Sequence, residues 1–268
     1  MPELPEVESY ARALSKEYAG KTIARIVFHR DNIRNTLNKQ AIRKVLTKNT
    51  TLKRVYRDGK QLVLETASGK VYISLGMSGA FLPTQLQSPG KHEHVTLAFT
   101  DGSAVGYIDP RRFGNWEARK DTLPHLADPM STASLSKLFA NENWKKSTRT
   151  IKDALMDQRA IGGIGNIYAL EALHLAHIHP KRKVHTLSTK GFGALATILP
   201  KLLKRAVNEG GSSISTYRRL HGDSGSFQEL HRVYNREDEK CLWKNCTGII
   251  ERIAQGGRSS WFCPVCQQ

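Results

Sequence analysis

The last 28 residues hold all four cysteines of the chain, and the spacing of these cysteines strongly limits how this segment can fold. Cys241 and Cys246 form a C-x4-C pair, and Cys263 and Cys266 form a C-x2-C pair sixteen residues later. Two close pairs at this separation are typical of a four-thiolate zinc site. The sixteen residues between the pairs contain two strand-like runs around the turn Gly256-Gly257. The pattern therefore predicts a zinc ribbon, a β-hairpin held at its base by one metal ion.

Four protein thiolates leave no coordination position for water, so the predicted zinc ion is structural. The alternative is four unligated buried thiols. A secreted disulfide framework is not favoured, because the cysteines cluster at one end of the chain. The sequence also has no run of 18 apolar residues and no basic-then-apolar start, and these absences favour a cytoplasmic protein.

The charge of the chain points to its partner. There are 41 Lys and Arg residues against 24 Asp and Glu residues, a formal net charge of +17. Such an excess favours a polyanion, and nucleic acid is the commonest one. A solvated basic surface is the alternative. Arg258, just past the predicted hairpin tip, is either a solvated turn residue or a residue able to reach a phosphate or an active site.

The sequence pattern changes along the chain and predicts an α+β protein. Residues 21–120 are rich in β-branched and aromatic residues, with turn signals at ASG (67–69) and TDGS (100–103). This part predicts an antiparallel sandwich or barrel. Helical patterns follow from residue 131. We expect domains at 1–130, at 131–235 and at 236–268.

Helical spacing also marks the N-terminus and the middle of the chain. A helix is predicted from Pro5 to about Gly20. Pro2 and Glu3 precede it, and helix capping explains little about them. Farther along, SLSKLFANENW, TIKDALMD, NIYALEALHLAHI and FGALATILPKLLKRAVNEG predict four helices. Gly162, Gly163 and Gly165 lie before the helix expected from Asn166. They could expose helix N–H groups to a phosphate or form a plain turn between helices.

Several motifs together resemble the formamidopyrimidine-DNA glycosylase / endonuclease VIII family. They follow one another along nearly the whole chain as PELPEVE, LGMSG (75–79), KHEHV (91–95), DPRRFG (109–114), GGIGNIYALEAL (162–173) and the cysteine ribbon. The resemblance implies an N-terminal β-sandwich, a helical domain with a helix-two-turn-helix, and a zinc finger.

The activity that the resemblance implies is base excision repair of double-stranded DNA. A bifunctional glycosylase and abasic-site (AP) lyase would remove 8-oxoguanine and formamidopyrimidines and nick the abasic site by β,δ-elimination. Two alternatives remain: an endonuclease VIII-like enzyme for oxidised pyrimidines, and a non-catalytic zinc protein that binds DNA. The Met77/Arg111/Phe113 trio and the glycine-rich loop at 221–234 favour the first reading. We expect a monomer associated with the nucleoid.

The resemblance assigns catalytic roles to Pro2, Glu3, Lys60 and Arg258. Removal of Met1 would free the Pro2 nitrogen, and an N-terminal amine has an ordinary pKa of about 8, which suits a nucleophile near neutral pH. Glu3 matches a general acid/base, and Lys60 matches a lysine that acts on the sugar oxygen. Arg258 matches a residue of the second elimination step. Glu6 matches a second family carboxylate, or is a first-turn helix charge.

The DNA-contacting positions carried over from the family are His92, Arg111, Lys152 and Asn166, with Arg258 as a further phosphate contact. Met77, Arg111 and Phe113 match the residues that fill the space left by an extruded base. Three departures from the family are visible. The first cysteine pair is C-x4-C where C-x2-C is usual, Ser74 stands where many members carry histidine, and a DNA-contacting lysine falls near Thr148. Lys145, Lys146 or Arg149 could replace that lysine.

Overall fold

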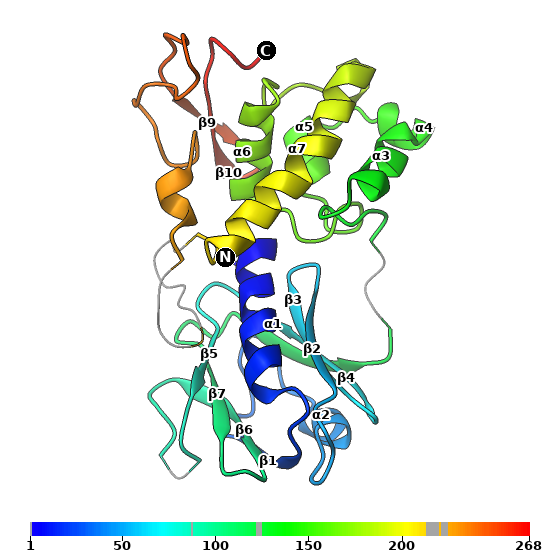
Figure 1. The fold of residues 1–268 in the computed structure, drawn as a ribbon, viewed down its shortest axis with the longest axis vertical. Helices are drawn as coiled ribbons and strands as arrows, with labels where there is room; N and C mark the ends of the chain where they lie inside the picture. The colour runs from blue at the N-terminus through cyan, green and yellow to red at the C-terminus, as the bar shows by residue number, and fades with distance from the viewer. Residues whose placement is uncertain (1, 87, 122–124, 213–219, 221–224) are drawn as a thin grey trace. The chain divides into compact units, whose positions relative to one another are not determined.

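The computed structural model describes residues 2–86, 88–121, 125–212, 220 and 225–268. The chain divides into two compact units (Figure 1). The first unit contains Met1–Leu123 and Glu209–Gln228, and the second contains Pro124–Asn208 and Glu229–Gln268. A short segment distant in sequence therefore completes the first unit.

The first unit is built from two antiparallel sheets of four strands each. One sheet has the order β1 (Ile23–Phe28), β6 (Glu93–Phe99), β7 (Ala104–Ile108) and β5 (Ala80–Pro83). The other has the order β2 (Arg54–Asp58), β3 (Gln61–Thr66), β4 (Gly69–Ser74) and β8 (Asn115–Arg119). The β3–β4 and β6–β7 hairpins turn at the two predicted turn signals. The sheets share one apolar core, which confirms the predicted antiparallel sandwich.

Helix α1 (Leu4–Tyr18) covers this core with the face that the sequence pattern predicts. Its apolar positions recur every three or four residues, and they are buried at Val7, Tyr10, Ala11, Leu14 and Tyr18. The helix ends at Tyr18 with Ala19 as its C-cap, and the next residue, Gly20, has a φ of +87°, a conformation that glycine adopts without steric cost.

Helix α2 (Lys39–Val45) lies in the part of the chain predicted to consist of strands, so the prediction is wrong here. The Asn38 side chain caps α2 by accepting a hydrogen bond from the Ala41 N–H at 3.0 Å. Ile42 and Val45, one helical turn apart, enter the same core as the strands. The segment is too short for its helical period to stand out from the strand-like residues around it.

The second unit consists of helices and one hairpin (Figure 1). The elements are α3 (Thr132–Ala140), α4 (Glu142–Lys145), α5 (Ile151–Leu155), α6 (Asn166–Leu175), α7 (Thr189–Asn208), β9 (Glu251–Gln255) and β10 (Arg258–Phe262). Two turns join α5 to α6, which gives the expected helix-two-turn-helix. The helix predicted over SLSKLFANENW breaks at Asn141, whose side chain caps α4. A short 3₁₀ helix lies at Val184–Thr186, and another, Phe227–Leu230, crosses the boundary between the two units in the sequence.

None of the helices in the described ranges combines the length and the apolar composition that crossing a lipid bilayer requires.

Candidate functional site

The N-terminal residues of the first unit are buried and held by Glu6. Pro2 and Glu3 are both buried. The Glu6 carboxylate, itself 2% exposed, accepts the Glu3 N–H at 2.7 Å and the Ser212 N–H at 2.7 Å. One carboxylate thus fixes both the residue after Pro2 and the segment that leads into residues 213–219. These residues and 221–224, which include the start of the glycine-rich loop, lie outside the described part of the chain.

Lys60 occupies the second position of a tight hairpin turn. Asp58 at the end of β2 pairs with Gln61 at the start of β3, so only Gly59 and Lys60 form the connection. Gly59 has a φ of +58°, as expected for two-residue turns with glycine in the first position. Gly59 is buried and Lys60 is half-buried. The turn thereby fixes where the Lys60 side chain leaves the sheet.

Met77, Arg111 and Phe113 come together, although LGMSG and DPRRFG lie far apart in sequence. They line one cavity of about 540 Å³ together with Asn32, Ile33, Arg34, Gly76 and Arg112. Met77 is 40% exposed and Phe113 is 44% exposed, so neither is a core residue. The Arg111 guanidinium lies 4.8 Å from the centre of the Phe113 ring. The trio therefore presents two apolar side chains and one cation to an open cavity, which Arg34 and Arg112 also line.

Asp109 connects the two loops that carry this trio, and sequence reasoning did not single it out. It is fully buried, and its carboxylate accepts hydrogen bonds from the Ser78 hydroxyl and from the Gly114 N–H. The same hydroxyl accepts the Arg111 N–H at 3.1 Å. The sequence feature that could have identified Asp109 is its position as a charged residue directly after the buried strand β7. His92 lies beside this loop, since its carbonyl accepts the Asp109 N–H, and its side chain is exposed.

Three of the assigned residues meet on the zinc hairpin in the second unit. The Lys152 ammonium donates to the Ser260 hydroxyl at 2.6 Å, and the Asn166 amide donates to the Ser259 carbonyl at 3.0 Å. These two serines follow Arg258, which is exposed at the start of β10. The structure thus brings Lys152, Asn166 and Arg258 together from two helices and one strand.

Lys152 is only 1% exposed. Burial lowers its pKa to about 8, the Asp153 carboxylate opposes that shift, and the Arg258 guanidinium adds to it. Asn166 also carries a buried side-chain oxygen that accepts no hydrogen bond from the described residues. The buried Lys152 ammonium, with the Arg258 guanidinium close enough to affect its pKa, indicates a place where an anion could bind.

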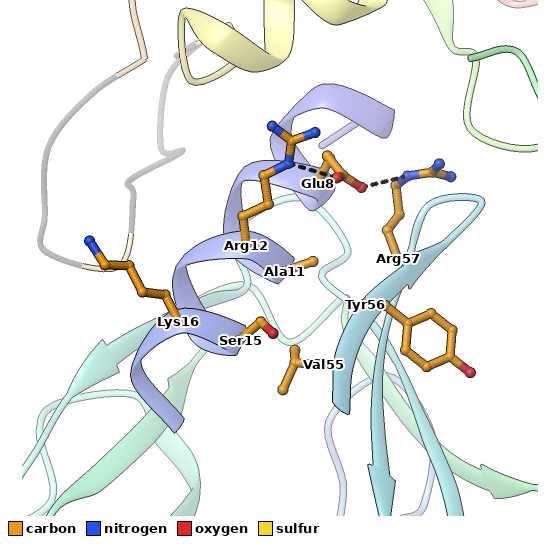
Figure 2. A pocket seen from close by; sticks show the side chains of 8 residues that line it. All are labelled: Glu8, Ala11, Arg12, Ser15, Lys16, Val55, Tyr56 and Arg57. Atoms are coloured by element: carbon orange, nitrogen blue, oxygen red, sulfur yellow. Dashed lines mark hydrogen bonds and ion pairs between the residues drawn. The ribbon is translucent and has the colours of Figure 1, made fainter. Parts of the chain in front are cut away.

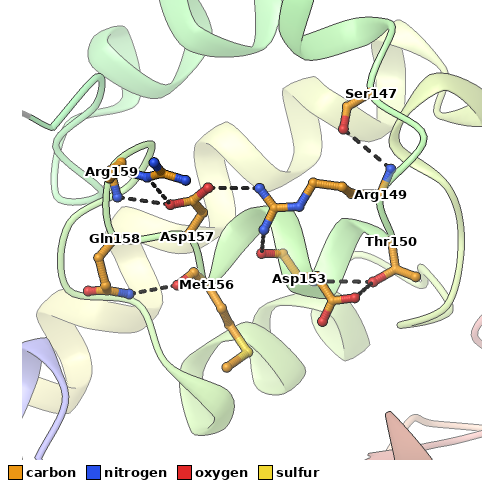
Figure 3. A network of polar contacts seen from close by, with 8 residues as sticks. All are labelled: Ser147, Arg149, Thr150, Asp153, Met156, Asp157, Gln158 and Arg159. Atoms are coloured by element: carbon orange, nitrogen blue, oxygen red, sulfur yellow. Dashed lines mark hydrogen bonds and ion pairs between the residues drawn. The ribbon is translucent and has the colours of Figure 1, made fainter. Parts of the chain in front are cut away.

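The turns between α5 and α6 are held by an ionic network (Figure 3). The Arg149 guanidinium contacts the Asp157 carboxylate at 2.7 Å and donates to the Asp153 carbonyl at 2.8 Å. Lys145 contacts Glu142 at 3.1 Å. Of the three basic residues near Thr148, Arg149 thus stabilises the two-turn segment and Lys145 pairs within α4. Lys146 is exposed.

The four cysteines form the expected metal site. The Sγ atoms of Cys241 and Cys266 lie 3.7 Å apart, and those of Cys246 and Cys263 lie 3.6 Å apart. All four sulfur atoms lie within 4.8 Å of one another. A tetrahedron with zinc–sulfur bonds of about 2.3 Å has edges of about 3.8 Å, so these residues fit one structural zinc ion. The hairpin above them turns at Gly256-Gly257, as predicted.

The long C-x4-C knuckle is accommodated by α6, and the sequence alone did not reveal this. The Trp243 indole N–H donates to the His174 carbonyl at 3.4 Å, and the Trp243 ring stacks on His177 at 4.5 Å between ring centres. His174 Nε2 lies 3.4 Å from the Cys241 sulfur, where an imidazole N–H can stabilise a metal-bound thiolate. The available signal in the sequence was the pair His174 and His177, which lie in the last turn of α6 and just after its end.

Three family models match the chain in sequence order. The formamidopyrimidine-DNA glycosylase N-terminal domain matches residues 1–116, and the H2TH domain of the same family matches residues 126–218. A zinc finger found in FPG and IleRS matches residues 239–268.

Curated relatives and solved structures cover the chain from end to end. Formamidopyrimidine-DNA glycosylases from Rhodopseudomonas palustris and Methylorubrum populi are 36% and 38% identical, and each alignment spans 100% of this chain and at least 99% of the relative. A Lactococcus lactis FPG variant with Fapy-dG DNA has a TM-score of 0.87 at 34% identity. MutM with carbocyclic 8-oxo-G DNA has a TM-score of 0.87 at 33% identity. Both structures cover 100% of the two chains compared.

Proposed function

The chain belongs to the formamidopyrimidine-DNA glycosylase family, and on this basis we propose that it excises oxidised purines from double-stranded DNA and then cleaves the abasic site. The observation that carries this proposal is the full-length similarity to proteins bound to Fapy-dG and 8-oxo-G DNA. AP lyase activity is typical of the family.

In the proposed reaction, the Pro2 nitrogen attacks C1′ of the damaged nucleotide. The nitrogen lone pair forms the new bond, the bond from C1′ to the base breaks, and the base leaves with the proton that the Pro2 nitrogen gives up. Opening of the sugar ring gives an iminium ion, and Lys60 would protonate or orient the ring oxygen. The iminium acidifies the C2′ proton, which Glu3 would remove as the 3′ phosphate leaves. Arg258 would assist the second elimination, in which the 5′ phosphate leaves.

DNA binding is proposed to use phosphate contacts and the trio of the first unit. His92, Lys152, Asn166 and Arg258 would contact phosphates. Because Lys152 is buried, the low local dielectric would strengthen the attraction between its ammonium group and a bound phosphate. Met77, Arg111 and Phe113 would fill the space of the extruded base, which offsets part of the unstacking cost of a few kcal/mol.

The zinc ion is proposed to support this chemistry without taking part in it. Its four thiolates hold the hairpin that carries Arg258, Ser259 and Ser260. We further propose functional domains at 1–130, 131–235 and 236–268, a monomeric protein, and association with the nucleoid.

Three oligonucleotide duplexes test the function. We expect excision and nicking of a duplex with 8-oxoguanine opposite cytosine, slower action on one with an oxidised pyrimidine, and nicking of one with a preformed abasic site. Product sizes on a sequencing gel report each reaction. A preference for the oxidised pyrimidine would favour the endonuclease VIII-like reading. Binding without any cleavage would favour the non-catalytic DNA-binding reading.

Arg111→Ala should damage base excision more than cleavage of an abasic site, because an abasic site has no base to extrude. Its guanidinium, placed over Phe113, can face the base opposite the lesion. We therefore also expect weaker discrimination between cytosine and other opposite bases, since a base-edge contact contributes about 1–3 kcal/mol of specificity. Single-turnover excision against all four opposite bases measures both effects.

Arg112→Ala provides the comparison, because it removes the same charge from the adjacent position. The opposite-base preference should persist in that variant. If Arg111→Ala slows excision and abasic cleavage equally and leaves the base preference intact, Arg111 anchors a phosphate and does not fill the vacated space.

A further inference from the structure

Glu8 on α1 pairs with two arginines that come from different parts of the fold. Arg12, on the same helix, contacts one carboxylate oxygen at 2.8 Å, and Arg57, on β2, contacts the other at 3.2 Å (Figure 2). The Arg12 side chain is 59% exposed, whereas that of Arg57 is 14% exposed. Both arginines line a cavity of about 380 Å³ between the helix and the strand. Of these two ion pairs, the one made by Arg57 joins two elements.

Arg57 also bonds to the backbone of the neighbouring turn. Its Nη1 donates to the Gly59 carbonyl at 3.3 Å, within the two-residue turn that carries Lys60. The planar guanidinium has several donors in a fixed fork, so one side chain can hold two acceptors in a defined relation. Through these two contacts, Arg57 connects the turn that carries Lys60 to Glu8 on α1.

Helix α1 is also the element that carries the N-terminus. Glu8 follows Pro2 by six residues and Glu3 by five, most of them in helical conformation. Because the Glu6 carboxylate accepts the Glu3 N–H, the first residues are fixed to the same helix. A shift of α1 against the β2–β3 hairpin would therefore move Pro2 relative to Lys60.

We propose that Arg57 is a positioning residue that sets the Lys60 turn against the N-terminal end of α1. The inference rests on the proposed function, in which Pro2 and Lys60 act on one sugar. Groups that must act together on one sugar, here at C1′ and at the ring oxygen, tolerate little displacement, and a misplacement of about 1 Å can cost on the order of 100-fold in rate. Because Arg57 bonds to the Gly59 carbonyl, it acts on Lys60 through the backbone of the turn.

The test compares Arg57→Ala with Arg12→Ala, each of which removes one guanidinium from the same carboxylate. We expect Arg57→Ala to lower the single-turnover rate of borohydride trapping at saturating 8-oxoguanine DNA by roughly 10- to 100-fold. The dissociation constant for DNA and its dependence on salt should stay near wild-type values. Arg12→Ala should retain the wild-type rate, because its contact lies within one helix.

Two further variants distinguish a positioning role of Arg57 from a mere contribution to the folding stability of the protein. Arg57→Lys should recover part of the trapping rate, since an ammonium can contact Glu8 but lacks the fork that also reaches Gly59. Glu8→Ala combined with Arg57→Ala should be little slower than Arg57→Ala alone, because the two residues act as one unit. Thermal unfolding of every variant shows that the rates come from folded protein.

Several results would overturn the proposal. An unchanged saturating rate in folded Arg57→Ala would remove the positioning role, whatever the change in melting temperature. A weaker and less salt-dependent DNA affinity with a normal saturating rate would make Arg57 a phosphate contact. Equal losses in Arg57→Ala and Arg12→Ala would indicate a general charge effect. Failure of the wild-type protein to form an adduct on residue 2 would instead contradict the proposed function.

Discussion

Protein that retains Met1, or that carries an N-terminal tag, should form no borohydride-stable adduct with DNA containing 8-oxoguanine. In both forms the Pro2 nitrogen belongs to an amide, whose lone pair is delocalised and cannot attack C1′. The processed protein should form the adduct readily, because a free N-terminal amine is partly neutral near its ordinary pKa of about 8. We expect a loss of at least about 1,000-fold in trapping, the scale on which loss of a nucleophile acts.

Duplex binding provides the control for this experiment. The phosphate-contacting residues proposed for both units are unchanged, so the dissociation constant for abasic DNA should rise only slightly. Mass spectrometry of the digested adduct should locate the linkage on residue 2. A linkage on Lys60 in the processed protein would contradict the assignment of Pro2 as the nucleophile. Strong trapping by a tagged protein would contradict it as well.

Loss of the zinc site should be the second large effect. Cys263→Ser replaces a fully buried ligand, and we expect it to release the metal, since structural thiolate sites supply much of the folding free energy of their small domain. The hairpin would then no longer hold Ser259 and Ser260, which contact Asn166 and Lys152. DNA affinity should fall by roughly 100-fold or more, because several side chains proposed to bind phosphates would be displaced at the same time.

Metal analysis and circular dichroism test this prediction independently of enzymatic activity. Metal analysis should give one zinc ion per wild-type chain and less in Cys263→Ser. The antiparallel sheets of the first unit have their own core, so circular dichroism should show that they remain folded. Val265→Ala, a change at an exposed position between two ligands, should retain the metal. Full nicking activity in metal-free protein would contradict the structural role of the zinc hairpin.

The sequence by itself determined the elements whose signals are local. Cysteine spacing and the Gly256-Gly257 turn predicted the zinc hairpin, and the apolar period of α1 predicted the buried face of that helix. The turn signals at 67–69 and 100–103 located two hairpins. Each of these features depends on hydrogen bonds and side chains within a few residues, so a short window of sequence contains the whole cause.

Some local signals were nevertheless too weak or were overridden. Helix α2 is short and lies among strand-like residues. The sequence does not reveal that Asn38 caps this helix, because the hydrogen bond from the Ala41 N–H is known only from the structure. The helix expected over SLSKLFANENW breaks because Asn141 uses its side chain to begin a new helix. In both cases a side chain competes for backbone N–H groups, which periodicity does not register.

Only the tertiary structure decided which distant residues meet. Glu6 bonds to Ser212 across 206 positions, Lys152 to Ser260 across 108, and Arg57 to Glu8 across 49. In the sequence, Glu6 could equally be a helix-terminal charge, and Arg57 was one basic residue among 41 lysines and arginines. Such pairings depend on how whole elements pack, because packing sets which polar groups lose water together and must satisfy one another. No local pattern carries that information.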